Sequence, residues 1–168
     1  MDYKQMTKHA AKLVRRVGKR DPFAAAKELG IEVLYCHDFT KLKGMYRVIK
    51  RNRFIFLNAT LNEQMLKIVC AHEIGHDQYH RKMATGAPFQ EFMLYQMNSR
   101  MEYEANMFTA EFLLDSAEVL EFIVQGYDID MVARALYTDI NLVALKLAHL
   151  KKQGYEVKTF DYHSDFLK

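Results

Sequence analysis

A single predicted helix over residues 60–80 constrains the fold of this chain more than any other segment. Its apolar residues recur at helical intervals on one face, and His72 and His76 continue that face. A helix with such a face has to be covered by other elements, so we expect it to cross the core. Imidazole rings at core positions need partners, so we expect both histidines to bind a polar group or an ion. The apolar residues of the face are Leu61, Met65, Ile68 and Val69.

The segment before this helix combines helical and strand patterns. Short runs rich in β-branched and aromatic residues predict strands, and two of them predict an antiparallel hairpin that turns near Arg51. Asp21 is placed to cap a helix that Gly30 ends, and Thr60 with Glu63 matches a capping box for the central helix. The predicted elements are helices over residues 3–18 and 22–30, a strand over 31–36, and strands over 44–50 and 53–58.

The segment after the central helix is mainly helical. Residues 81–97 show no clean period and are expected to form a loop, whereas residues 99–114 predict a second long helix. Three shorter helices follow, and a small sheet with helices in separate parts of the chain predicts an α+β fold. The expected N-caps of the three short helices are Asp115, Asp130 and Asn141.

Composition indicates an ordinary globular protein. Half of the 168 residues are hydrophobic and 27% are charged, which suits one domain with its own core. No apolar run is long enough to span a membrane, and the charged first twenty residues do not resemble a secretory signal. Two distant cysteines, Cys36 and Cys70, indicate reduced thiols and a cytoplasmic location.

Charge is unevenly distributed along the chain. Residues 41–53 hold six Lys and Arg residues and no acid, whereas residues 102–139 hold nine acids and Arg134 as the one base. Such asymmetry serves nucleic-acid binding in some proteins, but solvated faces that compensate within the fold are commoner. Direct binding to nucleic acid is therefore not expected.

The residues His72-Glu73-Ile74-Gly75-His76 form the pattern HExxH. Four residues of helix advance about 6 Å and return to the same face, so two imidazoles at this spacing can converge on one ion. Zinc binds neutral imidazole and leaves an open position for water in catalytic sites. Glu73 would lie beside that position, where a carboxylate can act as a general base. The pattern predicts a zinc site with Glu73 as its base.

Two nearby residues refine this prediction. Gly75 costs about 1 kcal/mol relative to Ala inside a helix, so its presence suggests that another segment passes close to that turn. His80 continues the same face but would stand about 12 Å from His72 along a straight helix, too far to share one ion with it. We therefore expect His80 to support the site rather than to bind the metal.

The third ligand is expected to be a carboxylate on the helix over residues 99–114. Glu102 shares its face with small residues that would allow close helix contact, and Glu104 lies on a more mixed face, so we favour Glu102 and keep Glu104 as the alternative. The amide oxygen of Asn106, on the same side as Glu102, is placed to accept the ring N–H of a metal-bound histidine. Without a metal, Glu102 would be a capping-box glutamate answering Ser99.

The segments "AHEIGH" and, some 26 residues later, "EYEANMFTAEFLL" resemble the ImmA/IrrE family of zinc metallopeptidases. Family members pair an HExGH helix with a helix of the form E-x-x-(A/C)-N-x-F-A-x-x-L-L. The hairpin before the first motif and the helical tail after the second fit the same plan, so the resemblance spans most of residues 20–155. Two departures affect only the end of the second helix: Thr109 replaces the usual Ala, and no Pro follows Leu113-Leu114.

The resemblance implies a minimal zincin-like domain, with a small and mostly antiparallel sheet packed on the HExxH helix and on a second ligand-bearing helix. It implies that His72, His76 and Glu102 bind Zn²⁺ and that Glu73 is the catalytic base. We expect a metallopeptidase core over residues 1–125 and a C-terminal helical extension over 126–168, packed together as one globular unit.

The resemblance also suggests a substrate. Family members with known roles cleave repressor proteins at specific sites, often those of prophages and mobile elements, or regulate stress responses. The expected partner is therefore a helix-turn-helix repressor. The alternative is a metal-binding regulatory or DNA-binding protein without proteolytic activity. Tyr79, Tyr95 and Tyr103 are candidates for stabilising the oxyanion, and the strand over residues 53–58 is a candidate for pairing with an extended substrate.

Overall fold

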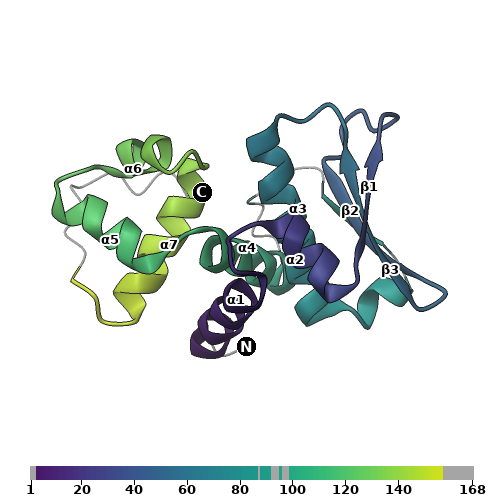
Figure 1. Ribbon diagram of the computed structural model, residues 1–168, viewed down its shortest axis with the longest axis horizontal. Helices are drawn as coiled ribbons and strands as arrows, with labels where there is room; N and C mark the ends of the chain where they lie inside the picture. The colour runs from purple at the N-terminus through teal and green to yellow at the C-terminus, as the bar shows by residue number, and fades with distance from the viewer. Residues whose placement is uncertain (1–2, 87, 92–94, 96–98, 157–168) are drawn as a thin grey trace. The chain divides into compact units, whose positions relative to one another are not determined.

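The computed structural model describes residues 3–86, 88–91, 95 and 99–156. The chain forms two compact units that divide between Leu113 and Leu114. The first unit contains the small sheet and the long helices, which confirms the predicted α+β fold, and the second contains three short helices (Figure 1). The predicted domain boundary at residues 125/126 falls inside the second unit, and the packing of the C-terminal helices on the core stays a prediction.

The elements follow the predicted order, with one strand added. The first unit contains α1 (Tyr3–Val17), α2 (Pro22–Leu29), β1 (Glu32–Cys36), β2 (Gly44–Ile49), β3 (Asn52–Asn58), α3 (Glu63–His80), the 3-10 turn η1 (Met83–Thr85), β4 (Phe89–Glu91) and α4 (Arg100–Leu113). The second unit contains α5 (Ser116–Val124), α6 (Ile129–Ala135) and α7 (Ile140–Lys152).

The described sheet has the strand order β1-β3-β2-β4. β1 is parallel to β3, and the other two pairs are antiparallel, so the sheet is mostly antiparallel as predicted. In the β2–β3 hairpin Ile49 pairs with Asn52, which leaves Lys50 and Arg51 as the turn. Both turn residues have positive φ, 47° and 70°, as a turn that follows the right-handed twist of two strands requires. The turn forms without the usual Gly because Lys50 and Arg51 themselves adopt the left-handed conformation.

Two expectations about strands are wrong. β3 is paired on both sides, with β1 and β2, so it has no free edge for an extended substrate. β4 lies in the segment that we expected to be a loop, because three residues are too few to show a strand period. The two edges of the described sheet are β1 and β4.

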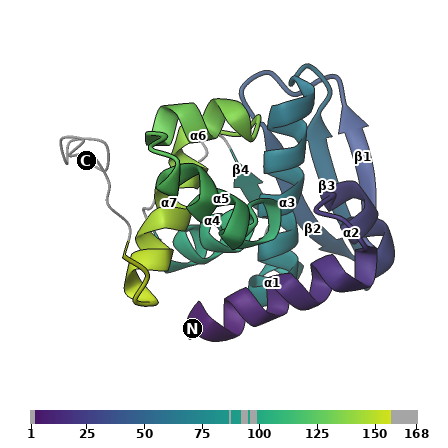
Figure 2. The same ribbon diagram turned by 60° about the vertical axis from the view of Figure 1, so that its left-hand side comes forward.

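α3 packs against the strands of the sheet and against α4 (Figure 2). Ile68, Val69 and Ile74 of this helix are buried, whereas Met65 and Leu66 near its start are partly exposed. Each buried aliphatic side chain contributes roughly 1.5–3 kcal/mol to folding. The helix begins one residue after Asn62, whose side chain accepts the backbone N–H of Met65 at 2.8 Å. The expected capping box is therefore wrong.

Asn58 explains why Thr60 does not cap α3. The Asn58 side chain accepts both the backbone N–H and the hydroxyl of Thr60, at 3.0 and 2.7 Å, and its amide donates to the carbonyls of Phe39 and Leu42. The Thr60 side chain is thereby engaged before the helix starts.

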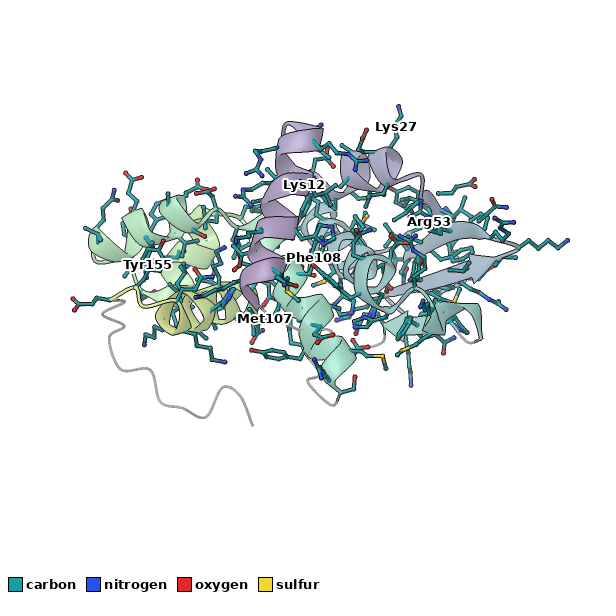
Figure 3. All side chains as sticks on the ribbon, turned by 90° about the horizontal axis from the view of Figure 1, so that it is seen from below. Lys12, Lys27, Arg53, Met107, Phe108 and Tyr155 are labelled. Atoms are coloured by element: carbon teal, nitrogen blue, oxygen red, sulfur yellow. The ribbon has the colours of Figure 1, made fainter. Side chains whose placement is uncertain are left out.

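Asp77 attaches α3 to the hairpin. Its buried carboxylate accepts the hydroxyl of Tyr46 at 2.6 Å and pairs with Arg53 at 3.2 Å. Figure 3 shows Arg53 beside the strands, and its guanidinium also donates to the carbonyl of Leu29. Burial and the neighbouring Asp77 carboxylate raise the pKa of Tyr46 above its usual range. This group fixes the position of the turn of α3 that carries His76.

α4 lies against both α3 and α1. Phe108 of α4 is fully buried and lies beside α1 (Figure 3). Its ring contacts His9 of α1 and Tyr79 of α3, with centroid distances of 6.4 and 5.8 Å. These contacts hold together the two helices that carry His72, His76 and Glu102.

The three helices of the second unit are capped by aspartates. Asp115 caps α5 as predicted, but Asp128 and Asp139 cap α6 and α7 in place of Asp130 and Asn141. In both corrected cases the observed cap lies two positions before the expected one, and the sequence pattern alone does not distinguish the two candidates. Among the described residues, no helix has the length and apolar character needed to cross a membrane.

Candidate metal centre

α3 brings the two histidines of the HExxH pattern together in the interior. The side chains of His72 and His76 are almost completely buried, and their ring centroids are 4.8 Å apart. Their Nε2 atoms are separated by 3.1 Å. Both rings therefore present the same nitrogen to one point, as the four-residue spacing predicts.

α4 brings Glu102 to the same point. Its Oε2 lies 3.2 Å from Nε2 of His72, and its Oε1 lies 3.4 Å from Nε2 of His76. Gly75 makes this approach possible, because a Cβ built on Gly75 would lie only 3.0 Å from the Cα of Ala105. The presence of Gly75 predicted that another segment passes close to this turn. That segment is α4.

The donor groups of these three residues fit a metal ion. In a tetrahedral zinc site with bonds of roughly 2.0–2.1 Å, ligand atoms are about 3.3 Å apart. The Nε2 atoms of His72 and His76 are 3.1 Å apart, and they lie 3.2 Å and 3.4 Å from Oε2 and Oε1 of Glu102, respectively. Among the described residues these three form a group of donors able to hold a metal.

His72 is oriented by Asn106, as predicted. The amide oxygen of Asn106 lies 2.9 Å from Nδ1 of His72, so it accepts the proton on that nitrogen. The hydrogen bond leaves Nε2 facing Glu102 and His76. A ring held by its Nδ1–H is a common arrangement for metal-binding histidines.

His76 is oriented by His80 and by Phe89. Nδ1 of His80 lies 3.1 Å from Nδ1 of His76, and the ring of Phe89 stacks on His76 at a centroid distance of 4.3 Å and an angle of 12°. His80 therefore supports the site without reaching the metal position, as expected.

Glu104 points away from the metal position. Its carboxylate pairs with Nε2 of His80 at 3.1 Å and with Nε of Arg100 at 2.9 Å. Of the two glutamates that the sequence left open, the structure brings Glu102 to the histidines. The capping-box alternative for Glu102 is half right, because Ser99 accepts the Glu102 backbone N–H at 3.2 Å while the side chain faces the metal position.

Glu73 is fully buried between the histidines and β2. A Cβ on Gly44 of β2 would lie 3.0 Å from Oε1 of Glu73, so Gly44 leaves the space that this carboxylate occupies. Neither carboxylate oxygen has a hydrogen-bond partner of normal geometry among the described residues. Burial raises the pKa of Glu73 to about 8 against the opposing effect of His72, with further increases from Glu91 and Glu102. In the metal-free protein this pKa leaves the Glu73 carboxyl mostly protonated at neutral pH, and only its ionised form can accept a proton.

Glu91 is the residue that the sequence did not reveal. It lies on β4, is almost completely buried, and places Oε2 3.1 Å from Nε2 of His72. Its carbonyl accepts the backbone N–H of Lys43 at 2.7 Å, which holds the edge strand in register. The sequence gives one indication of this strand, the apolar Phe89 followed by the polar Gln90 and then Glu91. Three residues are too few to be recognised as a strand.

The two histidines differ in charge in the absence of a metal. Burial lowers the pKa of His72, but its hydrogen bonds with Glu102 and Glu91 outweigh burial and raise the pKa to about 10. Burial lowers the pKa of His76 to about 4 despite Glu102. Burial raises the pKa of Glu102, but the two histidines outweigh it and hold that pKa far below its usual range. The surrounding carboxylates thus favour positive charge at Nε2 of His72.

Tyr79 does not face the metal position. Its hydroxyl lies 3.1 Å from Nδ1 of His9 on α1, so it is directed towards α1 rather than towards an oxyanion at the metal position. For Tyr95 and Tyr103 that role stays a prediction.

Two comparisons with known proteins identify the family of this chain. The IrrE N-terminal-like domain family matches residues 26–156, which include both motifs and all four site residues. The "Uncharacterized immunity region protein 2" of Bacillus phage phi105 is 31% identical over 149 residues, which cover 89% of each chain. The chain therefore belongs to the family of the IrrE N-terminal-like domain, the ImmA/IrrE metallopeptidase family.

Proposed function

We propose that this protein is a zinc-dependent endopeptidase that cleaves a repressor or another regulatory protein at a specific site. The observation that carries the proposal is the convergence of Nε2 of His72, Nε2 of His76 and the Glu102 carboxylate within 3.1–3.4 Å, with Glu73 buried beside them. Two histidines and one carboxylate are the protein ligands of several catalytic zinc sites.

The metal would be held by His72, His76 and Glu102. When bound, zinc supplies a Lewis acid that polarises a peptide carbonyl and makes water more acidic. Glu73 then takes one proton from the attacking water as the C–O bond forms. It returns that proton to the departing nitrogen as the C–N bond breaks, so the carboxylate is regenerated. Asn106 and His80 keep the two rings in position throughout.

A repressor substrate is supported by the relative from phage phi105, whose name describes it as an immunity region protein. A helix-turn-helix repressor is therefore the first substrate to test. Incubation of candidate repressors with the zinc-loaded protein, followed by mass spectrometry, should reveal one cleavage position rather than general degradation.

The decisive variant is Glu73→Gln, which removes the base and preserves the shape of the side chain. We expect cleavage to fall by roughly 10²–10⁴-fold while zinc content stays at the wild-type level. The matched control is Glu63→Gln, because Glu63 also lies on α3 but its side chain is 74% exposed and pairs with Lys67. Equal cleavage by metal-loaded wild type and Glu73→Gln contradicts the proposed mechanism.

The alternative is a metal-binding regulator, with or without DNA binding, that has no proteolytic activity of its own. It predicts that Glu73→Gln retains the regulatory function in cells, whereas His76→Ala, which removes a ligand, abolishes it. The endopeptidase proposal predicts that both variants lose the function. A reporter assay with the two variants distinguishes these cases.

A further inference from the structure

His80 and Glu104 are buried polar residues next to the metal position that take no part in holding the ion. The side chain of His80 is 4% exposed and that of Glu104 is 9% exposed. They continue a chain of contacts that starts at a metal ligand: Nδ1 of His76 to Nδ1 of His80 at 3.1 Å, Nε2 of His80 to Glu104 at 3.1 Å, and Glu104 to Nε of Arg100 at 2.9 Å.

The donor and acceptor of each hydrogen bond can be assigned in turn, starting from Arg100. Arginine only donates, so the Glu104 carboxylate accepts from it. The second carboxylate oxygen accepts from Nε2–H of His80. In a neutral imidazole one nitrogen donates and the other accepts, so Nδ1 of His80 accepts from Nδ1–H of His76.

This direction leaves Nε2 of His76 without a proton, which is the state that a metal ligand requires. At His72 a single residue fulfils this role, because the amide oxygen of Asn106 accepts the Nδ1–H of the ring directly. The chain ends at the solvent, since the Arg100 side chain is 76% exposed. α4 therefore supplies both a ligand, Glu102, and the carboxylate that orients the other ligand ring through His80.

We propose that His80 and Glu104 are positioning residues of the metal site, which hold the His76 ring in the tautomer and orientation that present Nε2 to the metal. The inference rests on the proposed function, because it assumes that His72, His76 and Glu102 bind zinc. Residues that orient metal-binding histidines in this way typically contribute 10–100-fold to metal affinity.

The first test measures Zn²⁺ affinity by competition with a chromophoric chelator. We expect His80→Leu and Glu104→Leu to lower the affinity by about 10–100-fold. His80→Gln should recover part of the loss, because an amide can accept from His76 and donate to Glu104. Glu104→Gln should likewise recover part of it, because the amide oxygen still accepts from His80. Glu63→Gln serves as the exposed control and should bind zinc as the wild type does.

The second test needs no variant and so does not depend on whether a substitution disturbs folding. In the zinc-loaded wild type, long-range ¹H–¹⁵N spectra should show His80 with its proton on Nε2 and none on Nδ1. A His80 ring protonated on Nδ1 contradicts the inference, as do Leu variants that bind zinc like the wild type. Those outcomes leave the peptidase proposal intact, whereas a wild type that binds no zinc contradicts both.

Discussion

His72 and His76 lie one helical turn apart, yet their surroundings give them opposite protonation behaviour. Two carboxylates, Glu102 and Glu91, face Nε2 of His72 and stabilise its cationic form. Burial lowers the pKa of His76, and the nearby rings of His72 and His80 lower it further, so the charged form of His76 is disfavoured. The balance between burial and the acidic neighbours of each ring, rather than the residue type, sets this difference.

Substitution of Glu91 tests this explanation. In metal-free protein, Glu91→Gln should lower the pKa of His72 from its value of about 10, because the imidazolium loses a negative neighbour at 3.1 Å. An opposite charge at this distance shifts a pKa by roughly 1–3 units. The measurement is an NMR titration of the His72 ring with Glu63→Gln as control, and an unchanged His72 titration shows that Glu91 does not act on it.

At the scale of elements, the contact between α3 and α4 decides where the site forms. The two helices approach each other at Gly75 and Ala105, and a side chain on Gly75 would meet backbone atoms of α4 rather than a flexible side chain. The distance between these helices sets the distance from Glu102 to the histidines. The site is therefore a property of the helix pair.

Gly75→Ala tests the helix contact. Helix propensity alone would make Ala more stable by about 1 kcal/mol, but the new Cβ would lie 3.0 Å from the Cα of Ala105. Because backbone has to move, we expect a net loss of about 1–3 kcal/mol in the free energy of unfolding and weaker zinc binding. Urea unfolding of metal-free protein measures the first effect. A variant more stable than the wild type would mean that α4 moves away without cost.

The N-cap of α2 gives a prediction about pH. Burial raises the pKa of Asp21, but Lys19 and the backbone N–H groups of Ala24 and Phe23 outweigh it and lower the pKa below its usual range. A lowered folded-state pKa means that the stabilisation is present at neutral pH and is lost as pH falls through that pKa. Asp21→Ala should therefore cost about 1 kcal/mol at pH 7 and much less near pH 2.

The matched variant for this position is Asp21→Asn. An asparagine caps a helix about as well as an aspartate but carries no charge, so it should keep most of the stability at pH 7 without the dependence on pH. Chemical unfolding of the three proteins across the acid range measures both effects. If the cost of Asp21→Ala stays constant down to pH 2, the ionised carboxylate does not contribute.

At the scale of the whole molecule, all the residues of the metal centre belong to the first unit. The candidate ligands come from α3 and α4, which are separated in the sequence by the segment that carries β4. The site therefore exists only in the folded state. A ligand that binds only the folded state stabilises it by mass action. Metal binding is therefore expected to stabilise the fold.

Zinc at a free concentration a hundred times its dissociation constant should add about 2.7 kcal/mol to the free energy of unfolding. A chelator should reverse the gain, and His72→Ala should show none of it. Hydrogen exchange should locate the added protection in α3 and α4. Equal zinc stabilisation of the wild type and His72→Ala would show that the metal binds elsewhere.

Much of the site could be predicted from local patterns. The helical period places His72 and His76 on one face, because a helix repeats every 3.6 residues whatever surrounds it. The cost of Gly75 in a helix pointed to a close neighbour, and the face shared by Glu102 and Asn106 pointed to their roles. Those predictions depend on the geometry within one helix, and residues close together in the sequence determine that geometry.

Convergence between elements was decided only by the tertiary structure. It brought Glu102 rather than Glu104 to the histidines, gave Glu104 to His80, and added Glu91 from a strand too short to show a period. It also left β3 without a free edge. The physical reason is that the sequence determines which face of a helix is apolar, whereas the distance between two side chains on different elements depends on how those elements pack.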